Sequence, residues 1–479
     1  MILKSMDYLG FDAYEKSINS ADSAVVFMAK DSDKDFLVIK SEDRELEFEG
    51  EKVGGGFFRA ELTHHNANVL RRLFPFTSPV RGLRNQKSFG LGDRLGIATP
   101  GHIDLFKNND VFPIFAQQSI RELNLTNRTY EDVLDAATFA VFREGYKKGF
   151  GADGDHLKTE KDIEYALSLG FTMITLDCSE YIKNGVTPDN APPLAEHYAE
   201  KYLNKKFDIE DGISLVFSEK ELRQCAAIYS DAISFAAQMY KTFFASGKYD
   251  ADFEISIDET VSVTTPLQHF FVAKELLDAG VSFATIAPRF CGEFQKGIDY
   301  IGDIVQFEKE IKVHAGIARH FGYKLSIHSG SDKFSVFPII GRETRGNFHV
   351  KTAGTNWLEA MRVAAINDPS LYREIHSYAL TVFEDAKKYY HVTTDLSKIP
   401  NISAMKDGEL ASLFEINESR QLIHITYGHI LSRKNTDGSF SYKDRLYKLL
   451  RKHEDKYRNA LMKHIGRHLE LLGVNPLPQ

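Results

Sequence analysis

Three histidines are the strongest candidates for metal-based chemistry in this chain. His156 follows the segment GADGD, His328 lies in KLSIHSGSD, and His349 lies two residues before Lys351, so that these last two side chains share one face of a strand. Neutral imidazole is a common ligand for zinc, manganese, cobalt and nickel ions, among which the residue types do not distinguish. No local motif unites the three histidines, so the predicted divalent-metal site depends on their lying on separate strands. A hydrogen-bonded core position is the alternative for His349.

Two carboxylates could supply acid–base chemistry beside these histidines. Asp155 directly precedes His156, and Glu259 ends the run ISIDE. Burial and a nearby metal ion would separate their pKa values, so that one group takes a proton and the other returns it. Cationic side chains would pair with an anionic substrate such as a small carboxylate. We therefore predict Asp155 and Glu259 as catalytic residues, together with a set of substrate-binding residues: Arg94, Gln118, Asp177, Arg289 and Lys351.

These candidates belong to a wider pattern, in which polar residues stand where short apolar runs stop. Each could be a helix cap or a turn residue. For Asp177 and Asp395, this structural role and a role in the site are equally compatible with the sequence. Together they form a ring of carboxylates, imidazoles and cations that a purely structural barrel would not need. Its members are Gln117, Gln118, Asp155, His156, Asp177, Asp258, Glu259, Arg289, His328, Lys351, Thr393 and Asp395.

The glycine-rich stretch SFGLGDRLGIATPGH, residues 88–102, does not fit a nucleotide cofactor. Gly90, Gly92 and Gly96 are spaced one residue too widely for the dinucleotide fingerprint, and Asp93 puts a negative charge where phosphate would lie. No Lys-Ser or Lys-Thr pair follows, so a P-loop is excluded as well. We predict an irregular loop, either a plain connection or part of a sugar- or acid-binding site, followed by a helix capped by Thr99.

Short apolar runs alternate with long amphipathic stretches from about residue 110, which is typical of parallel strands joined by helices. Eight strand–helix units over about 300 residues predict a (β/α)8 barrel of the TIM type, with a doubly wound open sheet as the competitor. The segment 420–428 is an alternative for the last strand. The predicted strands are residues 111–118, 150–155, 171–177, 253–259, 283–288, 324–329, 348–352 and 389–394.

Three parts are predicted along the chain. Residues 1–80 contain short alternating runs that indicate a small β-rich element, residues 81–402 form the α/β barrel, and residues 403–479 form a helical extension. The stretch 179–217 is too long for an ordinary connection after a strand, and we interpret it as an insertion that covers the active site.

The bulk composition narrows the classes of partner. A net charge of −8 argues against nucleic acid, and the basic residues of the last helix alternate with acidic ones. The three cysteines are too far apart for a metal or redox pair, which fits a reducing cytoplasm. No signal-peptide core and no run of roughly 18 apolar residues is present, so we expect a cytoplasmic protein without a membrane partner. A homo-oligomer is possible.

Five stretches carry a family resemblance. SFGLGDRLGIATPGH, GFGADGDHLK, ISIDET with TTPLQHFF, LSIHSGSDKF and FHVKTAGTNWLEA follow one another between residues 88 and 360, and together they resemble the tagaturonate epimerase family of hexuronate catabolism. The resemblance implies a metal-dependent, barrel-like enzyme that interconverts D-tagaturonate and D-fructuronate, with no nucleotide cofactor. It also implies His156, His328 and His349 as metal ligands, and Asp155 and Glu259 as proton-transfer residues.

The implied reaction constrains the mechanism. The two ketouronates differ at a hydroxylated carbon that is one position beyond the carbon beside the ketone, so removal of an acidic α-proton cannot invert it. A retro-aldol cleavage, rotation of the aldehyde and aldol re-formation would do so, with a metal ion as Lewis acid. The rival hypotheses are another metal-dependent sugar isomerase or aldolase, and a catalytically silent sugar-acid-binding protein.

Overall fold

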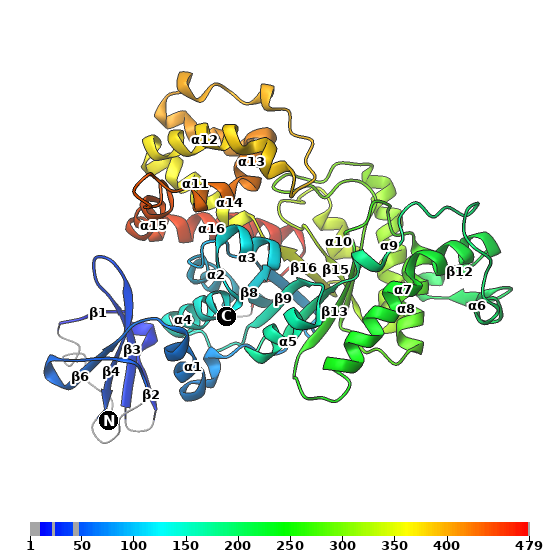
Figure 1. Cartoon of the computed structure of the whole chain (residues 1–479), viewed down its shortest axis with the longest axis horizontal. Coiled ribbons are helices and arrows are strands. Elements are labelled where there is room, and N and C mark those ends of the chain that lie inside the picture. Colours follow the sequence, from blue (N-terminus) through cyan, green and yellow to red (C-terminus); the bar gives the residue numbers. More distant parts are fainter. Residues whose placement is uncertain (1–9, 22–23, 42–46, 478–479) are drawn as a thin grey trace.

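The structure is a computed structural model that describes residues 10–21, 24–41 and 47–477; the first nine residues of the predicted N-terminal element lie outside these ranges. Three parts are visible in Figure 1: an antiparallel sheet near the N-terminus, a central barrel, and a group of helices from the last quarter of the chain. Each part has apolar side chains buried in its own core.

The central part is a closed barrel of parallel strands with helices around it, so the prediction of a TIM-like α/β barrel is confirmed. Seven strands correspond to predicted ones. In sequence order the barrel strands are β7 (Lys87–Leu91), β8 (Phe112–Ser119), β9 (Gly151–Leu157), β10 (Met173–Asp177), β13 (Asp252–Ile257), β14 (Thr285–Pro288), β15 (Lys324–Ile327) and β16 (Phe348–Thr352).

One strand was predicted in the wrong place. The first four residues of the glycine-rich stretch, 88–91, belong to strand β7, which pairs with β16 and β8 and closes the barrel, whereas residues 389–394 form no strand. The alternative segment 420–428 is helical. Gly90 makes room for the end of the Gln117 side chain, because a Cβ at this position would lie 1.8 Å from Oε1 of Gln117. The following helix α2 (Thr99–Phe106) begins one residue earlier than predicted, with Ala98 instead of Thr99 at its cap.

The helices that surround the barrel pack their apolar faces on the strands. Helix α7 is the longest, and Ser218 and Glu221 form a capping box at its start. The flanking helices are α3 (Ile120–Thr126), α4 (Tyr130–Glu144), α5 (Glu160–Ser168), α7 (Glu219–Phe243), α8 (Pro266–Asp278), α9 (Ile304–Phe321) and α10 (Phe337–Glu343).

We refer to the helices that follow β16 as the C-terminal extension, because those on both sides of the predicted boundary at residue 403 share one core. Its core surrounds Trp357, whose indole N–H donates to the carbonyl of Ile423 at 2.7 Å. The last helix returns to the barrel, where Ile465 and Leu469 join the barrel core. The extension contains α11 (Thr355–Asn367), α12 (Pro369–Lys387), η9 (Asp407–Glu415), α13 (Asn417–Ile425), α14 (Tyr427–Ser432), α15 (Lys443–Lys452) and α16 (Glu454–Leu471).

The two remaining parts are the N-terminal sheet and the insertion at residues 179–217. The N-terminal sheet contains β1 (Asp12–Ala13), β2 (Asn19–Ala21), β3 (Ala24–Lys30), β4 (Asp35–Ser41), β5 (Gly50–Val53) and β6 (Phe57–Ala60), followed by α1 (His64–Leu73). Within residues 179–217, α6 (Glu196–Tyr202), β11 (Lys206–Asp208) and β12 (Ser214–Val216) pack against α7 and α8 at the right edge of Figure 1. No helix in the described ranges is long and apolar enough to cross a membrane.

Candidate active site

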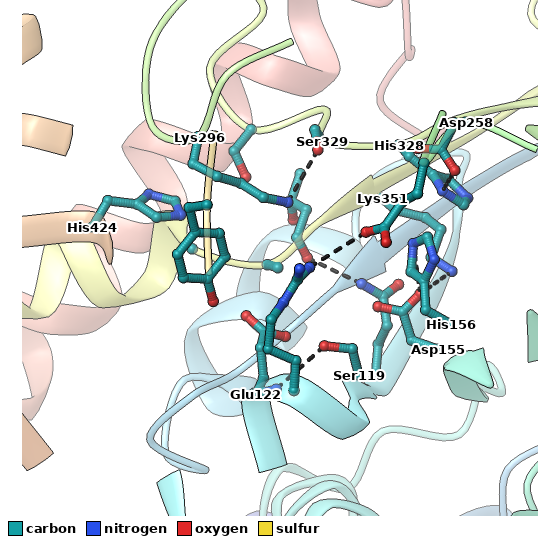
Figure 2. A pocket seen from close by; sticks show the side chains of 18 residues that line it. Ser119, Glu122, Asp155, His156, Asp258, Lys296, His328, Ser329, Lys351 and His424 are labelled. Carbon is teal, nitrogen blue, oxygen red and sulfur yellow. Dashed lines mark hydrogen bonds and ion pairs between the residues drawn. The ribbon is translucent and has the colours of Figure 1, made fainter. Parts of the chain in front are cut away.

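A polar cavity opens at the carboxyl ends of the barrel strands (Figure 2). Its floor and walls come from several strand ends, and one side is closed by His424 of α13 and by Tyr390, both from the C-terminal extension. The cavity continues outward into a wider mouth lined by Arg289, Glu293 and His391, among others. None of the residues lining the cavity or this mouth comes from residues 179–217, although Asn184 of this segment accepts a hydrogen bond from the backbone of Val261 at the mouth. That the insertion covers the site stays a prediction.

One group of side chains in the cavity has the composition of a metal site. His156, Asp258 and His328 each offer a ligand atom within 4.8 Å of the others. His156 lies at the register shift between the pairs Gly154–Ile174 and Leu157–Leu176 of β9 and β10. Its φ of 56° is a left-handed conformation that is uncommon for a residue with a side chain, and its ring centroid lies 4.8 Å from that of His328. Asp177 and Glu259 form a second such group with the same His156.

His328 lies between two carboxylates. Its Nδ1 is 3.0 Å from Oδ1 of Asp258, and its Nε2 is 2.8 Å from Oε1 of Glu254. Burial alone would lower the pKa of His328, but these two negative charges outweigh it and raise the pKa to about 10. Without a metal ion the ring is therefore doubly protonated at neutral pH, and binding of a metal at either nitrogen would release a proton.

Lys351 joins the histidine group to a deeper carboxylate network. Its Nζ lies 2.5 Å from Asp155, 2.7 Å from Asp153 and 3.3 Å from Glu254, and it donates to Thr175 at 2.6 Å. Burial opposes the charge on Lys351, but the carboxylates outweigh this and raise its pKa. For Asp155, burial raises the pKa, while Lys351 and the neighbouring imidazoles more than reverse it. Asp155 is therefore an ionised carboxylate facing the cavity.

The structure places the other predicted metal ligand and Asp177 just outside this cavity. Two residues along a strand correspond to roughly 6.6 Å, so His349 lies one layer deeper in the barrel than Lys351, although both share a face. Its Nδ1 is 3.0 Å from Oγ of Ser88, and burial lowers its pKa to about 3. His349 is thus a buried barrel residue, and Asp258 is the third member of the group in its place. Asp177 lies behind His156, with 3.6 Å between Oδ2 and Nδ1.

Three predicted substrate-binding residues do not face the inner cavity. Arg94 is buried, donates to Glu122 at 2.9 Å and to the carbonyl of His424 at 2.9 Å, and stacks on Tyr427. Gln118 points to the side of β8 opposite to Gln117 and Ser119, which line the cavity. Arg289 lies in the outer mouth and donates to the carbonyl of Thr260.

Several lining residues were missed at the sequence level. Arg121 and Glu122 come directly after β8, and Lys296 lies in the loop 289–303 between β14 and α9. The unusual length of that loop was the available signal, because long loops at the open end of a barrel are frequently functional. Loop length does not reveal His424 or Tyr390, because the sequence pattern predicts strands at residues 389–394 and, as the alternative, at 420–428.

Comparison with known proteins places this geometry in a family. A family model described as tagaturonate epimerase matches residues 14–472. The chain belongs to the tagaturonate epimerase family. It is 46% identical over 477 residues to the tagaturonate/fructuronate epimerase of Thermotoga maritima, with 97% of each chain covered. Members of this family are isomerases that act on carbohydrates.

Solved structures of one relative have the same fold. The glycerol-complexed crystal structure of fructuronate-tagaturonate epimerase from Cohnella laeviribosi is 49% identical, with a TM-score of 0.94 and 97% of each chain covered. The native structure of the same enzyme is 48% identical, also with a TM-score of 0.94, and covers 98% of this chain and 99% of that one. The similarity therefore includes all three parts of the fold.

Proposed function

We propose that this protein is a metal-dependent epimerase that interconverts D-tagaturonate and D-fructuronate by cleaving and re-forming a carbon–carbon bond. The observation that carries this proposal is the meeting of His156, Asp258 and His328 in one cavity with the ionised carboxylate of Asp155, in a chain of the tagaturonate epimerase family.

The side chains present fit a divalent ion. Two imidazoles and a carboxylate are a ligand set that several transition-metal ions accept. In the described structure, the buried Nδ1 of His156 and Oδ2 of Asp177 lie 3.6 Å apart and neither has a hydrogen-bond partner, so both keep lone-pair or donor capacity at the edge of the proposed site. His156, Asp258 and His328 would hold the ion, and when bound it would supply Lewis-acid polarisation of the substrate oxygens.

The reaction inverts C4 of a 2-ketohexuronate. A carboxylate removes the proton of the C4 hydroxyl, the C3–C4 bond breaks, and its electron pair moves onto C3 and the C2 carbonyl as an enediolate, while C4 becomes an aldehyde. After the aldehyde turns over, C3 attacks its other face and the new C4 alkoxide takes the proton back. Asp155 and Glu259 are the two groups assigned to this proton, and the Lys351 ammonium beside Asp155 stabilises the developing negative charge.

The test is to incubate the purified, metal-loaded protein with D-tagaturonate and to follow the products by NMR. Fructuronate as the single product supports the proposal; accumulation of three-carbon fragments would identify an aldolase, an aldose product an isomerase, and binding without turnover a silent binding protein. In deuterium oxide, the C4 hydrogen remains on the aldehyde carbon throughout the proposed route. Solvent deuterium at C4 would therefore contradict it.

Single variants test the assignment of the two carboxylates. Asp155→Asn and Glu259→Gln keep the shape of each side chain and remove its basicity, so each is expected to lower kcat by roughly 10²- to 10⁴-fold. Elemental analysis of the same samples shows whether the metal content is retained. Full turnover in either variant with metal still bound would remove that residue from the mechanism.

A further inference from the structure

The side of the cavity opposite to the metal group has an excess of positive charge. In Figure 2, Lys296 and His424 lie on the left, whereas His156, Asp258, His328 and Lys351 lie on the right. The charged groups around Lys296 include Arg94, Arg121, Glu122 and Glu259, and the cationic Lys333 lies on the far side of its loop. Cations therefore outnumber carboxylates among these groups, and Glu122 is already paired with Arg94 at 2.9 Å.

Lys296 is the least compensated of these cations. Its ammonium group has one hydrogen bond, to Oγ of Ser329 at 3.0 Å, and no carboxylate of the described residues lies within ion-pair distance. Burial and the neighbouring Arg121 lower its pKa. Because a buried charge without a partner is costly, such a group is expected to gain its partner from a ligand.

Arg121 has spare hydrogen-bonding capacity beside it. Its contact with Glu259 is long, at 3.4 Å, and its bond to the carbonyl of Tyr389 is also 3.4 Å. Its buried Nε has no partner in the described structure, although the guanidinium lies over the ring of Tyr390. A guanidinium with free donors is well suited to a planar carboxylate.

The loop that carries Lys296 is held rigidly by groups that do not enter the cavity. Arg420 donates to the carbonyl of Gly297 at 2.7 Å, and the buried Lys333 donates to the carbonyls of Gln295 and Ile298 at 2.8 and 2.6 Å. A Cβ at Gly297 would lie 2.8 Å from the His424 ring, so α13 packs directly on the loop. The position of Lys296 is thus fixed before any ligand binds.

We propose that Lys296 and Arg121 bind the carboxylate of the sugar acid, and that this contact selects acids over neutral sugars and fixes the direction in which the substrate lies. This inference rests on the proposed function. With the carboxylate at Lys296, the ketone end of the six-carbon chain lies at His156 and His328 on the opposite side, and the central carbons span the cavity between the two sides. The cations expected from sequence lie elsewhere: Lys351 is beside Asp155 on the metal side, Arg94 is paired with Glu122, and Arg289 lies in the outer mouth.

The test compares the sugar acid with its neutral counterpart, D-tagatose, in which a hydroxymethyl group replaces the carboxylate. Loss of a charge-assisted hydrogen bond in Lys296→Met is expected to raise KM for tagaturonate by roughly 10- to 100-fold, with kcat changed by less than about 3-fold. For D-tagatose, kcat/KM is expected to stay within about 3-fold of wild type. Lys388→Met is the matched control, because Lys388 pairs with Asp385 on the surface close to Tyr390 but does not reach the cavity.

The possible outcomes separate the two proposals. A wild-type protein that forms no fructuronate from tagaturonate refutes the proposed function, whereas normal turnover with an unchanged KM in Lys296→Met refutes the carboxylate site. An equal loss on the acid and the neutral sugar also overturns it, as does borohydride trapping of the substrate on Lys296, which would show an imine instead. If Lys296→Met fails to fold, Lys296→Arg is expected to keep the preference for the acid and Arg121→Met to reduce it, and the reverse result refutes the site.

Discussion

His376 provides a direct test of the electrostatics of the C-terminal extension. It lies in α12, its side chain is fully buried, and neither ring nitrogen has a hydrogen-bond partner in the described structure. Burial lowers its pKa to about 4, whereas an exposed histidine titrates near 6.5. The native state therefore keeps His376 neutral over a range of pH in which the unfolded chain binds a proton.

The sign and size of the effect follow from this difference. Since the folded pKa is the lower one, stability is complete above about pH 6.5 and is lost as the pH falls towards 4. At pH 5 the histidine of the unfolded chain is protonated, about 1.5 units below its pKa of 6.5, whereas His376 of the folded protein is still mostly neutral. This difference lowers the free energy of unfolding by about 2 kcal/mol relative to neutral pH. This is a large part of the free energy of unfolding of an ordinary domain.

The assay is urea unfolding at pH 7.5 and at pH 5.0, followed by tryptophan fluorescence. Trp357 is the single tryptophan of the chain and lies in the core of the extension, so its signal reports on this part. His376→Leu and His376→Gln both remove the titration, one with an apolar and one with a polar side chain. Each is expected to lose about 2 kcal/mol less than wild type between the two pH values, whatever its stability at pH 7.5. An unchanged loss in both variants would refute the reasoning.

Three further predictions concern the site. Asp258→Asn removes the carboxylate of the proposed metal group and is expected to lower the metal content of dialysed protein; elemental analysis with the same content as wild type would contradict the ligand assignment. Arg94→Met leaves Glu122 buried without its partner and is expected to cost about 3–5 kcal/mol in urea unfolding, against less than 1 if the pair is dispensable. Gly90→Ala forces the flexible Gln117 side chain, which lines the cavity, to move. It is expected to raise KM with little change in melting temperature, and a clear fall in melting temperature beside the raised KM would contradict this.

Much of the barrel and part of the site could be predicted from sequence. Buried parallel strands give short continuous apolar runs, and their ends lie at one face of the barrel, so Asp155, His156, Glu259, His328 and Lys351 were expected together and do line one cavity. The sequence pattern does not reveal strand β7, because only Phe89 and Leu91 of its five residues are apolar and Gly90 lies between them, so that no continuous apolar run is present.

Depth within the barrel and the origin of the cavity wall could not be predicted. Alternation along a strand gives the side on which His349 lies but not its layer. Lys296 is positioned by long-range contacts from Arg420 and Lys333, and His424 reaches the cavity from a helix far along the chain. Such contacts have no periodic signature in the sequence.

The division of the site between barrel and extension has a consequence for specificity. The metal group and Asp155 are fixed by barrel strands, whereas the loop of Lys296 is held by Arg420 and packed by His424 from α13. Loosening the extension should therefore weaken recognition of the acid before it disturbs the metal group. At pH 5, where His376 destabilises the extension, KM for the sugar acid should rise more in wild type than in His376→Leu, while bound metal changes equally in both. An equal rise in KM in wild type and in His376→Leu would show that the placement of Lys296 does not depend on the stability of the extension.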